Sequence, residues 1–167
     1  MRFGILTISD RSSRGERLDV SGPALMEAVI VHGGQVVVTG VVPDEIEVIR
    51  RQLSQWVESG LLDVILTTGG TGFAPRDVTP EATRLVIERL TPGLDEAMRA
   101  ASLKITPHAM LSRAITGISK RTIIINLPGS PRGALENLQV VLPVLAHAVK
   151  LLHDDPDSEK GHLASKP

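Results

Sequence analysis

The residues best suited to chemistry lie in one short stretch, Thr67-Thr68-Gly69-Gly70-Thr71-Gly72. Glycine adopts positive φ angles and carries no Cβ, so a ligand can come close to the backbone amides of this stretch. The threonine hydroxyls can donate hydrogen bonds to anionic oxygens. Neither a Walker lysine nor a Gly-x-Gly-x-x-Gly pattern occurs here, so the standard nucleotide fingerprints do not apply. The composition nevertheless predicts a loop that binds an anion such as phosphate.

Two aspartates add the chemistry of a metal site. Asp77 follows the glycine loop directly after Arg76, and a carboxylate beside a bound phosphate is repelled unless a cation lies between them. Mg²⁺ is the natural cation, because it takes one or two carboxylates plus phosphate oxygens. Alternatively, Asp77 bonds only the backbone of its own loop, as Asp often does in turns. Asp44 is either a site carboxylate or the N-cap of a helix with Glu47 three residues on.

The elements that must position these residues alternate between strands and helices. Val64 to Leu66 predicts a buried strand before the glycine loop, and Thr79-Pro80 predicts a helix start after it, with Thr79 as N-cap and the helix running on to Leu90. The run from Gln35 to Val42 is nearly all apolar, which predicts a strand covered on both faces. Further strands are expected over residues 3–9 and 122–126, and further helices from near residues 21, 44, 92 and 131.

This alternation predicts an α/β fold of three layers, a mostly parallel sheet with helices on both faces. The carboxyl ends of parallel strands meet at one edge of such a sheet, where open α/β proteins bind ligands. Polar residues follow four of the expected strands: Ser9-Asp10, Asp44, Thr67 to Asp77, and Asn126 to Ser130. The sequence therefore predicts a phosphate-binding site at that edge.

Composition restricts the function classes. The 167 residues carry 18 basic and 19 acidic side chains, two Phe, one Trp, no Tyr and no Cys. Balanced charge and few aromatic residues argue against nucleic-acid binding, and no apolar run of transmembrane length argues against a membrane protein. The histidines lack zinc-ligand spacing. We expect one domain over residues 1–153, a polar tail over residues 154–167, and a cytoplasmic location, since no signal-peptide pattern opens the chain.

Several motifs resemble the molybdopterin adenylyltransferase family, which includes bacterial MogA and the G domains of gephyrin and plant Cnx. The matching segments run in order, with compatible spacing, over about residues 3–153: Ser9-Asp10, residues 42–45, 67–72, 75–83, 91–93, 111–113 and 126–129. The resemblance implies an enzyme of molybdenum cofactor synthesis, and the domain over residues 1–153 would then be a MogA-like catalytic domain. Such an enzyme transfers AMP from ATP to the terminal phosphate of molybdopterin with Mg²⁺ and releases pyrophosphate.

The same resemblance implies roles for particular residues. The essential carboxylate pair falls on Asp44 and Asp77, which would hold the metal. Residues near the nucleotide phosphates or the pterin would be Ser9, Asp10, Thr68, Gly69, Gly70, Thr71, Gly72, Arg76, Ser102, Ser112, Arg113, Asn126, Pro128 and Gly129. We expect a homotrimer that hands its product to a separate molybdate-insertion enzyme.

Two other functions remain open at this point. One is a non-catalytic or weakly active MoaB-like or scaffold trimer that binds molybdopterin. The other is a different nucleotide-dependent enzyme on the same fold. Two carboxylates beside a phosphate loop favour the enzyme over the scaffold, because a scaffold does not need them.

Overall fold

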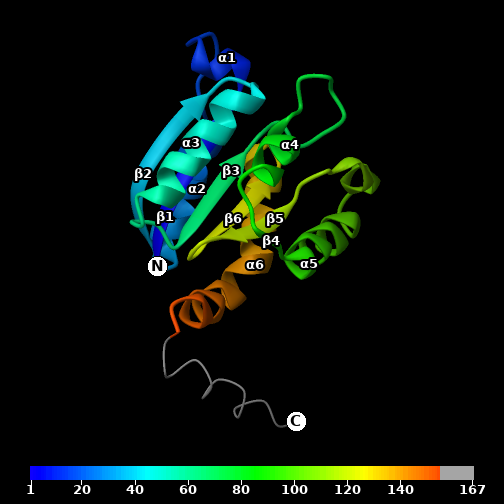
Figure 1. Cartoon of the computed structure of the whole chain (residues 1–167). Helices are drawn as coiled ribbons and strands as arrows, with labels where there is room; N and C mark the ends of the chain where they lie inside the picture. Colours follow the sequence, from blue (N-terminus) through cyan, green and yellow to red (C-terminus); the bar gives the residue numbers. More distant parts are fainter. Residues whose placement is uncertain (155–167) are drawn as a thin grey trace.

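The computed structural model describes residues 1–154 and contains one six-stranded sheet with the strand order β2-β1-β3-β6-β5-β4 (Figure 1). Of the predicted polar tail, residues 155–167 lie outside the described residues. The strands are β1 (Arg2–Ile8), β2 (Gln35–Val42), β3 (Val64–Thr68), β4 (Arg89–Leu90), β5 (Thr116–Ser119) and β6 (Thr122–Leu127).

The central strands of the sheet are parallel. β1 pairs in parallel with β2 and β3, and β3 pairs in parallel with β6. β5 returns antiparallel to β6, and the short β4 pairs antiparallel with β5 at the far edge. The predicted α/β class with a mostly parallel sheet is confirmed.

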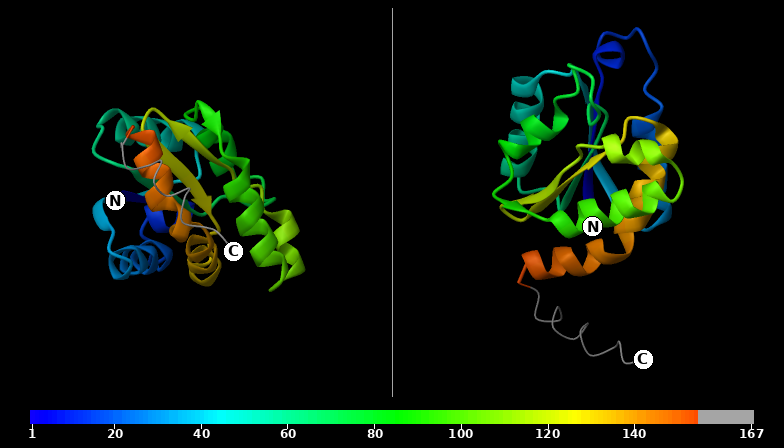
Figure 2. Two further views of the ribbon diagram at one scale, coloured as in Figure 1. Left: turned by 90° about the horizontal axis from the view of Figure 1, so that it is seen from below. Right: turned by 90° about the vertical axis from the view of Figure 1, so that its right-hand side faces the viewer.

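Helices cover both faces of this sheet (Figure 2). The helices are α1 (Asp10–Ser13), α2 (Ser21–Val31), α3 (Ile46–Glu58), α4 (Thr79–Arg84), α5 (Pro92–Leu103) and α6 (Pro131–Leu152), with a 3-10 helix, η1, at Pro107–Leu111. Helices α2 and α6 pack side by side on one face, with α5 beside α6, and helices α3 and α4 pack on the other. The result is the expected three-layer arrangement.

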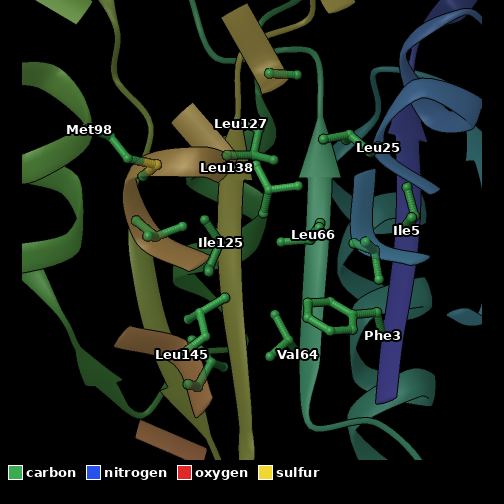
Figure 3. Close-up of a cluster of buried hydrophobic side chains, with 14 residues drawn as sticks. Phe3, Ile5, Leu25, Val64, Leu66, Met98, Ile125, Leu127, Leu138 and Leu145 are labelled. Carbon is green, nitrogen blue, oxygen red and sulfur yellow. The ribbon is translucent and has the colours of Figure 1, made fainter. Parts of the chain in front are cut away.

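Each face of the sheet has its own apolar core. Leu66 on β3 and Ile125 on β6 point toward α2 and α6, where they meet Leu25, Leu138 and Leu145 (Figure 3). On the opposite face, the strands contribute Leu6, Ile65 and Ile124 to a second apolar cluster. Helix α3 contributes Ile49, Leu53 and Trp56 to the same cluster, and α4 packs beside α3. All five residues of β3 are buried, because this strand is covered from both sides.

Strand β2 differs from the prediction. We expected cover on both faces, but β2 is an edge strand whose residues alternate between exposed and half-buried, with Val37 and Val41 each about 40% exposed (41% and 42%). Apolar composition alone does not distinguish a central strand from an edge strand, because the neighbours of the strand decide its burial.

The helix after Thr79 also differs from the prediction. α4 ends at Arg84, and the residues Arg89 and Leu90 form strand β4 rather than the last helical turn. The hydroxyl of Thr79 does not cap the helix, since it donates to the carbonyl oxygen of Gly69 (2.8 Å). Its bond ties the helix start to the glycine loop, a tertiary contact that local sequence does not reveal.

Helix α6 is long and apolar enough, by length and composition alone, to cross a membrane. Its composition has a simpler explanation. The helix presents an apolar face at helical spacing that is buried against the sheet: Ala134, Leu138, Val141 and Leu145. Ser130 caps the helix by accepting from the N–H of Gly133 (3.2 Å). α6 is therefore a core helix of the α/β domain.

The two-sided burial of β3 predicts where stability resides. Leu66→Ala should lower the free energy of unfolding by about 2–5 kcal/mol, because it opens a cavity in a fully buried layer. Leu85→Ala is the matched control, since Leu85 is 61% exposed and its truncation should change stability by less than about 0.5 kcal/mol. Urea denaturation of both variants measures the difference. Equal losses would contradict the assignment of β3 to the centre of the core.

Candidate active site

The carboxyl ends of β1, β2, β3 and β6 converge at one edge of the sheet and form a pocket, here called the rim pocket, of about 390 Å³. Hydrogen bonds tie the loops together: the Thr68 hydroxyl donates to the carbonyl of Pro128 (2.7 Å), and the Ser21 hydroxyl donates to the carbonyl of Gly129 (2.8 Å). The lining includes Ser9, Arg17, Asp19, Ser21, Asp44, Thr68, Gly69, Gly70, Asp77, Gly129 and Ser130. The predicted convergence of strand ends is confirmed.

Gly69 and Gly70 shape the floor of this pocket. Both have positive φ angles, +107° and +62°, which favour glycine. A Cβ on Gly69 would collide with the carbonyl oxygen of Ile8, and one on Gly70 would collide with the Thr79 hydroxyl and lie 2.9 Å from Asp44 Oδ1. The carboxylate of Asp44 therefore packs directly against the glycine loop.

Asp44 is not the helix cap that its sequence position suggested. The N-cap of α3 is Glu45, without a side-chain cap bond. Instead Asp44 Oδ2 accepts from the backbone N–H of Asp10 (2.8 Å), and Asp10 Oδ1 accepts from the N–H of Asp44 (3.1 Å). This reciprocal pair of hydrogen bonds joins the end of β1 to the end of β2. Of the two interpretations of Asp44, the helix cap is wrong, and the site carboxylate stays a prediction.

Arg76 reaches across to the same pair. Its guanidinium grips the carboxylate of Asp10 with two hydrogen bonds, of 2.7 and 2.9 Å. Hydrogen bonding to Arg76 lowers the pKa of Asp10 below its ordinary value. Burial, reinforced by the charges of Asp10 and Asp77, raises the pKa of Asp44 above its ordinary value.

Asp77 makes a bond within its own loop and also lines the rim pocket. Its Oδ2 accepts from the N–H of Ala74 (2.9 Å), the loop bond expected of a turn aspartate. The residue also lines the rim pocket with Asp44, and a Cβ on Gly72 would lie 2.8 Å from Asp77 Oδ2. The carboxylate is thus held by its own loop while it faces the pocket.

Arg113 braces the loop that carries Asp77. Its guanidinium donates to the carbonyl of Gly72 (2.7 Å) and also bonds the carbonyl of Asp77 and the carboxylate of Glu81. Its backbone N–H donates to the carbonyl of Thr71 (2.9 Å). The guanidinium is therefore engaged with the protein, which is the geometry of a positioning residue.

A second pocket adjoins the first and lies between α5, α6 and η1; it is called here the α5–α6 pocket and has a volume of about 270 Å³. Ser130 lines both pockets and marks the wall where they meet, and Pro128, Thr71 and Gly72 line the α5–α6 pocket alone. Predicted residues Ser102 and Ser112 line this pocket together with Met98, Arg99, Ala109, Leu111, Ala114 and Asn137. The Ser102 hydroxyl accepts from the side-chain amide of Asn137 (3.0 Å).

Asn126 lies inside the protein rather than in either pocket. Its side chain is fully buried, donates to the hydroxyls of Thr67 (2.9 Å) and Thr83 (3.0 Å), and accepts from the N–H of Ile115 (3.4 Å). The structure brings the other predicted residues to one of the two pockets or, for Asp10, Arg76 and Arg113, to the hydrogen bonds around them.

Some pocket residues carried no signal in the sequence. Asp19 lines the rim pocket and accepts from the Thr7 hydroxyl (2.7 Å). Asp95 lines the α5–α6 pocket. Asp95, Met98, Arg99 and Ser102 share one helical face, so their spacing could have been noticed, but without the partner helix nothing distinguishes a pocket-facing stripe from a core-facing one.

The donor set fits a magnesium ion shared with a phosphate ligand. Within residues 1–154, no group of three or more His, Cys, Asp or Glu could hold a metal by itself. Asp44 and Asp77 nevertheless face one pocket beside a glycine loop, and Mg²⁺ is commonly bound by one or two carboxylates plus substrate phosphates. Two carboxylates, backbone amides and a neighbouring apolar pocket define a site for a polyanionic ligand with an organic part.

Comparison with known proteins agrees with this class of site. The family described as "Probable molybdopterin binding domain" matches residues 4–147. Molybdopterin adenylyltransferase of Helicobacter pylori (strain J99) is 40% identical over 154 residues, 91% of this chain and 88% of that protein. The crystal structure of the molybdopterin biosynthesis enzyme MoaB of Thermus thermophilus has a TM-score of 0.87 and 50% identity, and the match covers 93% of this chain and 98% of that one.

The chain therefore belongs to the molybdopterin-binding family, as the motifs predicted. Gephyrin of Dictyostelium discoideum is 48% identical over 165 residues, 93% of this chain. This chain spans about a quarter of the length of gephyrin and of the molybdenum cofactor synthesis protein cinnamon of Drosophila melanogaster (23% and 26%).

The raised pKa of Asp44 predicts a pH-dependent gain in stability for Asp44→Asn. When the folded pKa of a carboxyl group exceeds its unfolded pKa, ionisation costs stability, and this cost grows as the pH rises from the unfolded pKa through the folded one. Asp44→Asn should therefore raise Tm at pH 7, and the gain should shrink toward pH 4. Thermal unfolding at both pH values measures it.

Glu27→Gln is the control for charge removal, since Glu27 is exposed on α2 and away from the pockets. Its Tm should stay close to that of the wild type at both pH values. An equal loss of stability in Asp44→Asn at pH 4 and pH 7 would show that the Asn disrupts the bond to Asp10 and that charge is not the main cost.

Proposed function

We propose that this protein is a molybdopterin adenylyltransferase, which transfers AMP from ATP to the terminal phosphate of molybdopterin. The observation that carries the proposal is the meeting of the two pockets at Ser130, which lines both. The rim pocket offers the glycine loop and the carboxylates of Asp44 and Asp77, which suits a metal-bound triphosphate. Asp19, the third carboxylate in its lining, accepts from the Thr7 hydroxyl. The α5–α6 pocket offers mainly apolar walls with a few polar groups, which suits a pterin. The relatives named molybdopterin adenylyltransferase support the same conclusion.

The reaction needs positioning more than covalent help. An oxygen of the molybdopterin phosphate attacks the α-phosphorus of ATP, the bond between the α-phosphorus and the bridging oxygen breaks, and pyrophosphate leaves with the bonding electrons. Transfer of this kind depends mainly on alignment and charge neutralisation. The N–H of Gly69 donates to the carbonyl of Leu127, so other amides of the glycine loop would hold phosphate oxygens. The shared wall at Ser130 would bring the attacking phosphate to the nucleotide.

Asp44 and Asp77 would hold Mg²⁺ when the nucleotide is bound. The ion pairs formed within residues 1–154 include Asp10 but neither Asp44 nor Asp77. Two carboxylates without a basic partner at a phosphate site repel the substrate unless a cation joins them. The bound Mg²⁺ would supply charge neutralisation for the phosphates of both substrates. Arg76 and Arg113 would hold the loops around it.

Pyrophosphate release from ATP tests the proposal. Wild-type protein should release pyrophosphate only when molybdopterin is present. Asp77→Asn and Asp44→Asn should each lower the rate by roughly 100-fold or more, the scale on which loss of one preorganised electrostatic group acts. Asp77→Asn should also need more Mg²⁺ for half-maximal rate. Glu58→Gln is the matched control, because Glu58 ends α3 and pairs with Lys120, remote from both pockets.

Other outcomes separate the alternatives. Pyrophosphate release without molybdopterin would favour a different nucleotide-dependent enzyme. Tight molybdopterin binding without turnover would favour a MoaB-like inactive protein or a scaffold. Full activity of Asp77→Asn with unchanged magnesium dependence would remove Asp77 from the metal site.

A homotrimer that passes its product to a molybdate-insertion enzyme in the cytoplasm completes the proposal. Support for association comes from β2, an edge strand of eight residues without a charged side chain, with Val37 and Val41 exposed. Proteins usually block or cover such edges, because unpaired strands associate. Sedimentation equilibrium should give three times the mass of the 17.9 kDa chain. A monomer at micromolar concentration, with full pyrophosphate-releasing activity, would contradict the trimer.

A further inference from the structure

One wall of the α5–α6 pocket contains a carboxyl group that the reaction does not use. Asp95 lies on the first turn of α5 and lines the pocket together with Met98 and Ser102 of the same helix. Its Oδ2 accepts from the N–H of Thr116 (3.1 Å). Its Oδ1 is shielded from solvent and has no hydrogen-bond partner among residues 1–154. Buried polar atoms are nearly always paired, so an unpaired one in a pocket wall indicates a missing ligand group.

The protein does not neutralise this carboxyl by an ion pair. Arg99, one turn further along α5, donates to the carbonyl of Ser112 (3.4 Å), and the ion pairs among the described residues do not include Asp95. Burial raises the pKa of Asp95, opposed in part by the backbone N–H and the hydroxyl of Thr116 and by the charge of Arg99. The other charged or titratable groups around it are Glu96 on α5, His108 on η1 and Glu136 on α6.

The neighbours of Asp95 define the chemistry of a ligand. Apolar side chains of Met98, Leu111 and Ala114 can pack on the faces of a flat heterocycle. A carboxylate accepts but does not donate, and its two oxygens match a pair of parallel N–H donors. Oδ1 is free, and Oδ2 keeps a second lone pair beside its bond to Thr116.

We propose that Asp95 determines the specificity of the α5–α6 pocket by accepting hydrogen bonds from a ring N–H and an adjacent exocyclic amine of a bound heterocycle. This is the 2-amino-4-oxo edge that a pterin presents, so the inference rests on the proposed function for the identity of the ligand. Because Oδ1 is shielded in the free protein, binding requires the carboxyl group to rotate toward the pocket. Two N–H donors favour the ionised carboxyl, so binding releases a proton when the free protein holds one.

Two fluorescent probes test the proposal directly on the full chain. Pterin (2-amino-4-oxopteridine) carries the donor pair, whereas lumazine (2,4-dioxopteridine) replaces the amine with a carbonyl oxygen. Wild-type protein should bind pterin at least about 10-fold more tightly than lumazine, because lumazine would face the carboxylate with an acceptor. Pterin affinity should rise as the pH increases through the raised pKa of Asp95 and then level off. This comparison needs no variant and therefore does not depend on how a variant folds.

Asp95→Asn should abolish the preference. The Asn amide offers one donor and one acceptor, which match an adjacent N–H and carbonyl; lumazine presents this pair, and pterin presents it on its 4-oxo side. The variant should bind the two probes with similar affinity, by a selective loss of pterin affinity, and lose the rise of affinity with pH, a result that a merely structural role would not produce. Glu96→Gln, at an exposed position next to Asp95, is the matched control and should keep the wild-type preference.

Equal binding of both probes by wild-type protein, binding of neither at millimolar concentration, or an equal loss of both in Asp95→Asn would overturn the inference. Its failure is distinguishable from failure of the proposed function. Molybdopterin-dependent pyrophosphate release with no discrimination between the probes would show that Asp95 does not determine specificity, and the proposed function would stand. Discrimination between the probes without pyrophosphate release would support Asp95 as the specificity residue and contradict the proposed adenylyl transfer.

Discussion

The site depends on one steric constraint: only hydrogen fits on Cα where the loops after β1, β3 and β6 meet. Gly69 lies against the carbonyl of Ile8, and a Cβ on Gly129 would be 3.2 Å from the Cα of Gly69. Since Gly69 and Gly70 also adopt positive φ angles, a side chain there would be strained as well as crowded. Backbone therefore approaches backbone at the floor of the rim pocket, and Arg17 is among the side chains of its lining. Because the glycines carry no Cβ, a ligand can come close to the backbone there.

Charge at the rim is distributed unequally among three carboxylates. Asp10 is satisfied by Arg76, and its own N–H binds Asp44. Asp44 is thus fixed in position by a hydrogen bond but not neutralised, and burial with two acidic neighbours raises its pKa. Asp77 is likewise fixed by the N–H of Ala74. Burial of the Asp44 carboxylate therefore lowers the stability of the free protein, while the hydrogen bond keeps the group oriented beside the glycine loop. Under the proposed function, a divalent cation and phosphate oxygens would make this arrangement favourable.

Periodic and local features of the chain were predictable, and tertiary ones were not. The four parallel strands, the helices between them, the buried β3 and the meeting of strand ends follow from hydrophobic pattern and the rules of parallel sheets. The edge position of β2 and the change from α4 to β4 depend on which elements pack beside these segments. The sequence pattern therefore gave a wrong prediction for both. Asp44 shows the same limit within the site. Its spacing to Glu47 fits a capping box, yet its partner is the N–H of Asp10, 34 residues away in the chain. Asn126 looked like a pocket residue because it ends β6, but its side chain turns inward to Thr67 and Thr83.

Arg113 explains how two pockets can act as one site. The 3-10 helix η1 lines the α5–α6 pocket, and the chain passes directly from it through Ser112 to Arg113. Arg113 then binds the carbonyls of Thr71, Gly72 and Asp77 with its backbone N–H and its guanidinium. Ser112 in the wall of the α5–α6 pocket is therefore tied, through Arg113, to the loop that carries Asp77. An arginine committed to carbonyl groups cannot also neutralise a phosphate without releasing that loop. Its planar fork of donors suits the bracing task, which a lysine with a single charged nitrogen could not perform in the same way.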